Sequence, residues 1–506
     1  MPLFDPDDGP FARTVARLAY CNPFLPERIT LEREGLGSAF NEAEADWNLE
    51  VQSAALPTNV VSLLQRVETV IEKCRAQLAN GAAIDAGEAD CYEALVFVLL
   101  YHSYVDEFDR TIRAAMSGTA GPLKLRFYER FVERFDHLLG PLTPHWAEPM
   151  SAGHLFAFFF QIRRAFHHIF RHIIGGSQPI ARLRAAVWES IFTHDMRRYR
   201  RVLYQKMGDV TTLITGPSGT GKELVARAIG LSRYIPFDEK SLRFTDDFVG
   251  SFYAINISAL STTLIESELF GHRRGAFTGA LQDRAGFLEA CPPLGAVFLD
   301  EVGEIDAGVQ VKLLRVLQTR SFHRLGDSAA RRFAGKIIAA TNRDLPAEIE
   351  AGRFRSDFYY RLCADLITTP SLREQIDESP DELGRLVHFL SEQVVGAEEA
   401  ERLTDEVLTW ISSSLGDAYA WPGNVRELEQ CVRNVLIRGA YRPARTAPTS
   451  TGDALAAAVR EGRLTSDELL NGYYRLIYER AGNLVEAARH LGVDRRTVRG
   501  RIDLGR

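Results

Sequence analysis

The sequence predicts an α/β domain with a parallel sheet, placed between a long all-helical region and a small helical unit. Three short apolar segments, at 210–215, 296–299 and 336–340, alternate with helical patterns, as in strands joined by crossover helices. The residues before about Ile174 repeat apolar side chains at spacings of three and four. We therefore expect an all-helical N-terminal regulatory or sensory domain over 1–172, an α/β domain over 173–440 with a helical lid from about 370, a linker over 441–463, and a helical C-terminal domain over 464–506.

Composition bounds the class of protein. The 506 residues, 46% hydrophobic and 25% charged, are typical of globular chains with several cores. The net charge of -7 excludes a uniformly basic nucleic-acid coat, so any DNA contact must be local. The six cysteines form no C-x-x-C pair. The sequence shows no secretory signal, and its longest apolar run, Ala94–Tyr101, is too short to cross a membrane. We expect a cytoplasmic protein with no membrane partner.

The predicted N-terminal helices cover Val60–Ala79, Asp90–Met116 and Leu155–Ile173, and they carry no phosphoacceptor cluster that we can place. His167, His168 and His172 share the last of these segments. They could form a metal or pH sensor, but histidines at a helix interface are the favoured interpretation. We expect this domain to gate the α/β domain in response to a ligand or partner that the sequence does not identify.

A phosphate-binding loop follows the first predicted strand. Gly216, Gly221 and Lys222 supply the G-x-x-x-x-G-K pattern between a strand and a helix. Glycines let backbone N–H groups surround phosphate oxygens, and the lysine reaches the terminal phosphates. The strict pattern continues with Ser or Thr, whereas this chain has Glu223. The predicted nucleotide-binding segment comprises Gly216, Pro217, Ser218, Gly219, Thr220, Gly221, Lys222 and Glu223.

Two carboxylates follow the second predicted strand. Asp300 and Glu301 end the apolar segment at 296–299, and ligands of parallel sheets bind at the carboxyl ends of the strands. We expect Asp300 to hold Mg²⁺ and Glu301 to polarise the water that attacks the γ-phosphate of ATP. A solvated acidic strand end is the alternative, and the nearby loop disfavours it.

The hexapeptide GAFTGA lies between these motifs, at Gly275, Ala276, Phe277, Thr278, Gly279 and Ala280. Glycines and alanines predict a mobile tip, and Phe277 and Thr278 offer it an apolar anchor with a hydroxyl. Together the motifs resemble the sigma-54-dependent activators, the bacterial enhancer-binding proteins of the AAA+ class. The resemblance covers roughly 174–440 and the C-terminus, and it implies that the hexapeptide contacts sigma-54.

The resemblance also implies roles for single residues. Asn256 resembles the asparagine that restrains the catalytic glutamate, here Glu301; Asn342 resembles the sensor of the γ-phosphate, and Arg426 the sensor in the lid. Arg355 and Arg361 resemble the paired arginine fingers that enter the neighbouring subunit's site. Fingers acting in trans require a closed ring, so a homo-oligomer between dimer and hexamer is expected. Glu223 is usual in this family.

Three departures from the family's pattern concern loop geometry rather than chemistry. Pro217 stands where the family usually has Glu, and the segments Leu231–Val249 and Ala181–Met207 are longer than is typical.

The last residues predict a helix-turn-helix. Asn483 and Asp494 are suited to cap two helices. Gly492 can make the turn between them, and Val498 and Ile502 are spaced to face the core. The pattern resembles the Fis-like domain of many enhancer-binding proteins. The predicted DNA-binding residues are Arg495, Arg496, Thr497, Arg499 and Arg501.

We expect an ATPase that binds enhancer DNA, assembles a ring and uses ATP and Mg²⁺ to remodel the sigma-54 RNA polymerase holoenzyme at closed promoters. Two alternatives remain. The chain could be a DNA-binding regulator that acts independently of sigma-54, or an AAA+ remodeller of unrelated targets.

Overall fold

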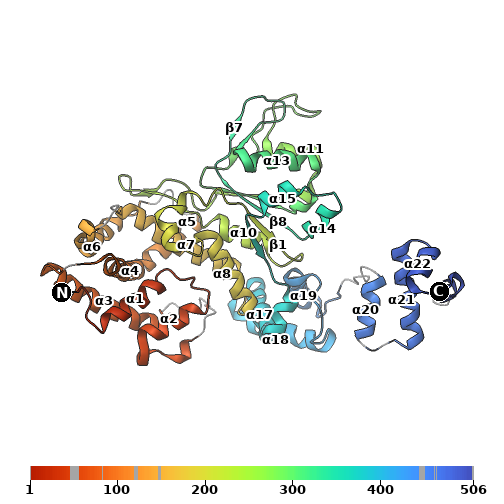
Figure 1. Ribbon diagram of the computed structural model, residues 1–506, viewed down its shortest axis with the longest axis horizontal. Helices are drawn as coiled ribbons and strands as arrows, with labels where there is room; N and C mark the ends of the chain where they lie inside the picture. The colour runs from red at the N-terminus through yellow and green to blue at the C-terminus, as the bar shows by residue number, and fades with distance from the viewer. Residues whose placement is uncertain are drawn as a thin grey trace. The chain divides into compact units, whose positions relative to one another are not determined.

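The computed structural model describes residues 2–45, 56–82, 84–118, 124–145, 150–443, 451–460, 462 and 464–503 (Figure 1). The chain forms two compact units, Met1–Gly439 and Ala440–Arg506. The first unit contains the predicted helical region, the sheet and the lid. None of the described helices is both long and apolar enough to cross a membrane.

The sheet of the first unit has five parallel strands in the order β4-β5-β8-β1-β9. The three predicted segments are confirmed as its three inner strands. The two strands that the sequence analysis missed lie at the edges, where each has one buried residue among half-buried and exposed ones instead of an apolar run. The strands are β1 (Thr212–Thr215), β4 (Phe252–Asn256), β5 (Ala296–Asp300), β8 (Lys336–Thr341) and β9 (Asp365–Thr368).

The sheet is covered on both faces, because successive side chains of a strand point to opposite sides. Leu213 and Ile337 belong to one hydrophobic core, while their neighbours Ile214 and Ile338 belong to the other. The second of these cores continues without interruption into the helical region. The helices of the sheet region are α10 (Lys222–Gly230), α11 (Thr262–Phe270), α12 (Phe287–Ala290), α13 (Ala307–Thr319), α14 (Leu345–Glu350) and α15 (Ser356–Leu362).

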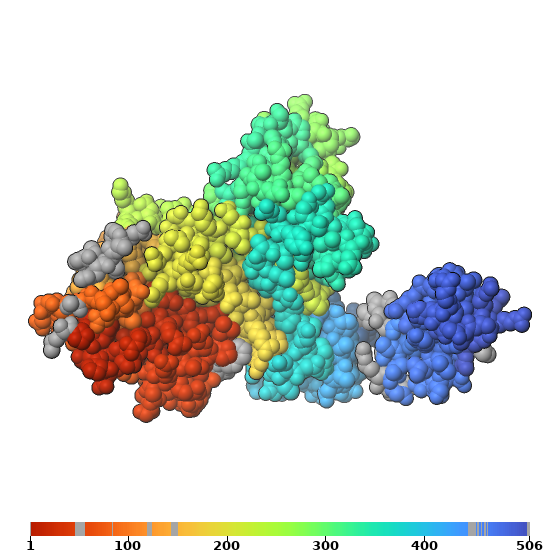
Figure 2. Space-filling model, viewed as in Figure 1, coloured from red at the N-terminus to blue at the C-terminus, as the bar shows by residue number. Residues whose placement is uncertain are grey.

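The helical region is all-α within the described residues, as predicted. The helix expected over 90–116 is divided at Tyr104, where φ is -122° and ψ is 9°, outside helical values. Figure 2 shows this region, in red to yellow, in direct contact with the sheet region in green. The helices are α1 (Asp8–Leu18), α2 (Glu27–Leu36), α3 (Thr58–Ala79), α4 (Ala86–Ser103), α5 (Val105–Met116), α6 (Tyr128–Leu139), α7 (Ala152–His172), α8 (Gln178–Phe192) and α9 (Met196–Arg201).

A short hairpin joins the two regions. Strands β2 (Phe237–Asp238) and β3 (Arg243–Phe244) are antiparallel and lie within the segment that is longer than the family's typical one. Phe244 stacks on Phe160 of α7 at a ring-centroid distance of 4.2 Å. The Glu239 carboxylate accepts hydrogen bonds from the N–H of Gly153 and the hydroxyl of Ser151, at the start of α7. The hairpin therefore holds the helical region against the sheet region.

The second lengthened segment, Ala181–Met207, supplies most of α8 and all of α9, and α8 packs on both α7 and α10. A second antiparallel pair, β6 (Ser321–Phe322) with β7 (Arg331–Arg332), lies near α13. The lid is helical, as the sequence predicts, and its helices are α16 (Leu372–Glu378), α17 (Glu382–Val395), α18 (Ala397–Ser414) and α19 (Asn424–Arg438).

The second unit is helical. Within the predicted linker, residues 444–450, 461 and 463 lie outside the described residues, but Thr451–Arg460 forms helix α20, so this part is not an irregular linker. Its alanines favour a helix once apolar neighbours from α21 can cover it. The helices that follow are α21 (Ser466–Ala481), α22 (Leu484–Leu491) and α23 (Arg495–Asp503).

Candidate functional site

The predicted phosphate-binding loop connects β1 to α10, the position that the motif requires. Gly216, Gly219 and Gly221 have φ values of 139°, 79° and 86°, which residues with a Cβ rarely adopt. A Cβ at Gly216 would lie 2.7 Å from the carbonyl oxygen of Thr369, and a Cβ at Gly219 would lie 2.2 Å from that of Gly423. The loop is therefore enclosed by β9 on one side and by the lid on the other.

Lys222 is buried at the first position of α10. Its ammonium donates to the carbonyl oxygens of Gly216 and Pro217, both at 3.0 Å. Burial lowers the pKa of Lys222, whereas the charges of Glu301 and Asp300 raise it. The cation thus lies inside the loop and close to the two carboxylates. Glu223 pairs with Arg227 one helical turn on.

A cavity of about 750 Å³ opens in front of this loop, a volume suited to a cofactor-sized ligand. The residues that line it come from the loop, the strand end, the lid and the last turn of α7. Predicted residues that line it are Ser218, Gly219, Thr220, Gly221, Lys222, Glu223, Asp300, Glu301 and Arg426. His172, Ile173 and Ile174 also line the cavity, so the helical region contributes directly to it. The sequence analysis did not assign these three residues to the nucleotide site.

The two carboxylates at the end of β5 fit a divalent cation. Asp300 accepts from the backbone N–H of Glu301 at 3.0 Å, and both residues line the cavity. Burial and the neighbouring charge of Glu301 raise the pKa of Asp300. Mg²⁺ would reverse that shift, and it prefers carboxylate and phosphate oxygens.

Glu301 has φ 57° and ψ 46°, a left-handed conformation that turns the chain directly after the strand. Its carboxylate lies within 3.4 Å of the backbone N–H of Asn342, the residue that follows β8. The side chain of Asn256 accepts from the hydroxyl of Ser258. In the described part of the chain Asn256 is therefore bonded to Ser258 rather than to Glu301, unlike the restraint that the resemblance implies.

The lid contacts the loop through two residues. The guanidinium of Arg426 lies 3.3 Å from the hydroxyl of Ser218, and the amide of Asn424 donates to the carbonyl of Ser218 at 2.9 Å. Asn424 is buried, has φ 52°, and accepts from the backbone N–H of Leu372. The sequence analysis missed Asn424. A signal was available, since Pro-Gly-Asn before a helical pattern predicts a turn that asparagine can cap.

Arg355 immediately precedes the short helix α15, and Arg361 lies in its last turn. Both are exposed. Arg355 makes a bidentate ion pair with Asp357, at 3.0 and 2.7 Å. Among the described residues, neither arginine lines the cavity of its own chain.

The hexapeptide follows α11, at the end of the first unit where α11, α13 and β7 gather (Figure 1). Gly275 and Gly279 have positive φ, and the backbone N–H of Gly275 donates to the carbonyl of Ala280, which closes the loop. Thr278 is exposed, and Phe277 is half-buried with its ring 5.0 Å from that of His272. Ion pairs from Arg273 to Asp283 and Asp327 hold the base of the loop.

The last two helices have the predicted caps. Asn483 accepts from two backbone N–H groups at the start of α22, Asp494 does the same for α23, and Gly492 is left-handed between them. Val498 is fully buried, as predicted. Four of the five predicted DNA-binding residues are exposed: Arg495, Arg496, Thr497 and Arg499.

Arg501 differs from the other four. It donates to Asp467 at 2.7 Å and to Asn471 at 3.2 Å, both in α21, so it points into the unit instead of outward. It lies three residues after the buried Val498, which places both on the inner face of the helix.

Residues 190–368 match the family model of the sigma-54 interaction domain. The Nif-specific regulatory protein of Azotobacter vinelandii is 42% identical over 58% of this chain and 53% of its own length. The transcriptional regulatory protein ZraR of Escherichia coli K12 is 41% identical over 58% of this chain and 63% of its own. The chain thus spans a little over half the length of these relatives.

Among solved structures, NtrX from Brucella abortus in complex with ATP aligns over 73% of this chain and 79% of its own, with TM-score 0.40 and 22% identity. The matched domain and the named relatives show that this part of the chain is similar to the sigma-54 interaction domain of transcriptional regulators.

Proposed function

We propose that this protein hydrolyses ATP in a ring of subunits and uses the cycle to remodel sigma-54 RNA polymerase at closed promoters, while its second unit holds enhancer DNA. The observation that carries the proposal is the joint presence, in one compact unit, of a closed phosphate loop, a carboxylate pair and the exposed GAFTGA loop. The match of residues 190–368 to the sigma-54 interaction domain supports sigma-54 as the partner.

ATP in the proposed site would lie with its phosphates against the loop N–H groups and Lys222. Mg²⁺ would be held by Asp300 and by phosphate oxygens, and it would neutralise charge on the transferring phosphoryl group. Glu301, beside the cavity, would take the proton of the attacking water. Arg426 and Asn424 both contact Ser218, so a change in the loop on hydrolysis would reach the lid through these two bonds.

Arg355 and Arg361 are exposed and do not line the cavity of their own chain among the described residues, which supports a role toward a neighbouring subunit. Guanidinium groups suit that role because they are always charged and bind phosphate oxygens bidentately. Asp357 would have to release Arg355 when the finger enters the next site.

The second unit would bind DNA through α23. Arg495, Arg496 and Arg499 share its outer face and suit phosphates and guanine edges, while Thr497 also bonds Asp494. Two such units in a dimer would match a palindromic upstream site.

The test is substitution of Thr278 by Ala. Because Thr278 is exposed at the loop tip, ATP turnover should stay close to that of the wild type, whereas open-complex formation on a sigma-54 promoter should be lost. Ser328→Ala removes an exposed hydroxyl from the adjacent loop and serves as the control. Normal promoter opening by the Thr278 variant would contradict the proposal and favour a regulator or remodeller independent of sigma-54.

A further inference from the structure

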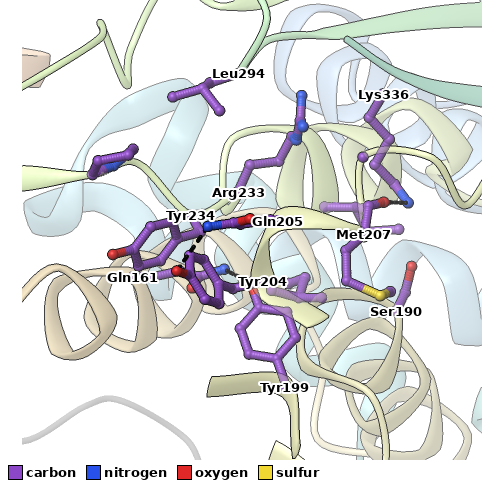
Figure 3. Close-up of a pocket in the computed structure, with 14 residues that line it drawn as sticks. Gln161, Ser190, Tyr199, Tyr204, Gln205, Met207, Arg233, Tyr234, Leu294 and Lys336 are labelled. Carbon is purple, nitrogen blue, oxygen red and sulfur yellow. Dashed lines mark hydrogen bonds between the residues drawn. The ribbon is translucent and has the colours of Figure 1, made fainter. Parts of the chain in front are cut away.

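A second cavity, of about 180 Å³, lies at the amino ends of the strands, away from the nucleotide loop at their carboxyl ends (Figure 3). Gln161 of α7, Ser190 of α8 and Tyr199 of α9 form one side. Arg233, which follows α10, and Lys336, the first residue of β8, contribute from the sheet region. The cavity is therefore built by both regions of the first unit.

Gln161 is only 1% exposed, yet the oxygen of its side-chain amide has no hydrogen-bond partner in the described part of the chain. The amide nitrogen donates to the hydroxyl of Tyr199 at 2.7 Å and to the carbonyl of Ser232 at 3.0 Å. The oxygen Oε1 is buried and, in the described part of the chain, accepts no hydrogen bond. A buried acceptor without a donor costs free energy, so this site favours a ligand that carries one.

Two cations line the same cavity, the buried Lys336 and the half-buried Arg233. The Lys336 ammonium donates to the carbonyls of Val210 at 2.7 Å and Met207 at 3.5 Å. The Arg233 guanidinium donates to the carbonyls of Pro293 and Gly295. In the described chain, both bond to carbonyl oxygens, and neither makes a carboxylate ion pair.

Burial disfavours the charged form of both side chains, and Asp365 and Asp209 oppose this only in part. Burial lowers the pKa of Lys336 to about 7; Asp365 opposes this shift, and Arg233 and Arg320 add to it. Burial also lowers the pKa of Arg233. An anion between the two side chains would restore the preference of both for the charged form.

The remaining walls are apolar and include Ile191, Met207, Ile229 and Leu294. We propose that this cavity binds a small hydroxy acid, with its carboxylate at Lys336 and Arg233, its hydroxyl donating to Oε1 of Gln161, and its apolar body against Ile191 and Ile229. The volume limits the ligand to roughly six to nine non-hydrogen atoms, because a cavity of about 150 Å³ accepts benzene.

A ligand here would connect the helical region to the sheet. Gln161 lies one helical turn before Arg164, whose guanidinium donates to the carbonyls that follow α10, and α10 begins at Lys222 of the phosphate loop. The binding itself is independent of the proposed function, whereas an effect on ATP turnover depends on it.

The experiment measures binding of 2-hydroxy-3-methylbutanoate to the full chain by calorimetry. Two analogues are compared with it: 3-methylbutanoate lacks the hydroxyl, and 2-hydroxy-3-methylbutanamide lacks the charge. We expect saturable binding of the hydroxy acid at one site per chain and about tenfold weaker binding of each analogue, since each leaves a buried group unmatched. The comparison needs no variant and so does not depend on the folding of one.

Variants then assign the contacts. Gln161→Leu should abolish the preference for the hydroxyl, and Lys336→Met should abolish the preference for the carboxylate. Gln178→Leu, at an exposed glutamine of α8, is the control and should change neither preference. The proposal is overturned if the hydroxy acid does not bind at millimolar concentration, if the amide binds equally well, or if both cavity variants retain both preferences. Binding without any ATP hydrolysis would sustain this inference and defeat the proposed function instead.

Discussion

The guanidinium of Arg164, in the helical region, donates to the carbonyl oxygen of Leu231, just beyond the last turn of α10. It donates also to the carbonyl of Arg233 at 2.8 Å and is 1% exposed, between the rings of Phe160 and Phe248. Burial lowers the pKa of Arg164 to about 9. A cation at the carboxyl end of a helix satisfies its last carbonyls and its dipole.

Arg164→Met should therefore destabilise the first unit by about 2–4 kcal/mol, because two carbonyls of the sheet region lose a charged donor. Urea unfolding of the full chain measures the change. Arg110→Met, at an exposed arginine of α5, is the control and should alter stability by less than about 0.5 kcal/mol. Equal stability of the two variants would show that this contact does not hold the regions together.

Stability should fall with acidity through the histidines of α7. Burial, then nearby arginines, lower the pKa of His172 from 6.5 to about 4, and burial also lowers that of His168. Between pH 6.5 and pH 4 the unfolded chain binds more protons at these histidines than the folded chain does. The stability of the folded state that is present above pH 6.5 is therefore lost as the pH falls toward 4. The slope is at most about 1.4 kcal/mol per unit and histidine.

Thermal unfolding of the wild type and of His172→Gln, followed from pH 7 to pH 4.5, measures this contribution. The variant should lose less stability over that range, because its side chain does not titrate. Parallel curves would mean that His172 is not shielded from protons. The histidines do not form a metal site in the described part of the chain, where no cluster of three or more ligating residues is found.

Glu301→Gln should separate nucleotide binding from hydrolysis. The amide keeps the shape of the carboxylate but cannot accept the proton of the attacking water, so turnover should fall by about 10²–10⁴ while ATP still binds. Lys222→Ala should instead abolish binding. Fluorescent nucleotide titration and phosphate release measure the two steps, and a Glu301 variant that turns over at the wild-type rate contradicts the assignment.

Arginine fingers acting in trans predict complementation. Arg355→Ala and Lys222→Ala should each be inactive alone, but a mixture should regain part of the ATPase activity, since some interfaces then pair an intact loop with an intact finger. Arg353→Ala is the matched control, because this neighbouring exposed arginine pairs with Glu348 of its own chain. A mixture as inactive as its parts indicates that Arg355 serves its own subunit.

The orientation of α23 predicts different effects for two arginines. Arg496→Ala should weaken DNA binding and reduce the slope of log affinity against log salt by about 1, as for loss of one phosphate contact. Arg501→Ala should mainly destabilise the second unit, since its partners are Asp467 and Asn471. Gel-shift titrations at several salt concentrations, together with unfolding curves, distinguish the two, and equal losses of affinity would reject the inward orientation of Arg501.

The inner strands were predictable from sequence because they are buried on both faces and read as apolar runs. The edge strands were not, since β4 includes exposed Ala254 and Asn256, and β9 includes exposed Leu366 and Thr368. The loop glycines, Lys222 and the carboxylates were found because their chemistry depends on short local patterns. Asn424 was missed because its role depends on a contact with Ser218, more than two hundred residues earlier in the chain.

The helical region could be predicted as helices, but its attachment could not. The contacts of Phe244 with Phe160 and of Glu239 with Gly153 join segments that nothing in their local sequence relates. The unusual length of the 231–249 segment was visible, yet length alone does not show what a segment touches.

The β2–β3 hairpin has a consequence for how such proteins diversify. Phe237 and Phe244 are covered by aromatic rings of the helical region, namely Tyr128, Phe156 and Phe160. A recombination event that replaced only the first 172 residues would leave these side chains exposed to water. The new N-terminal region would have no matching surface on the hairpin. The hairpin and the helical region must therefore be inherited together, although more than sixty residues of unrelated sequence separate their contacts.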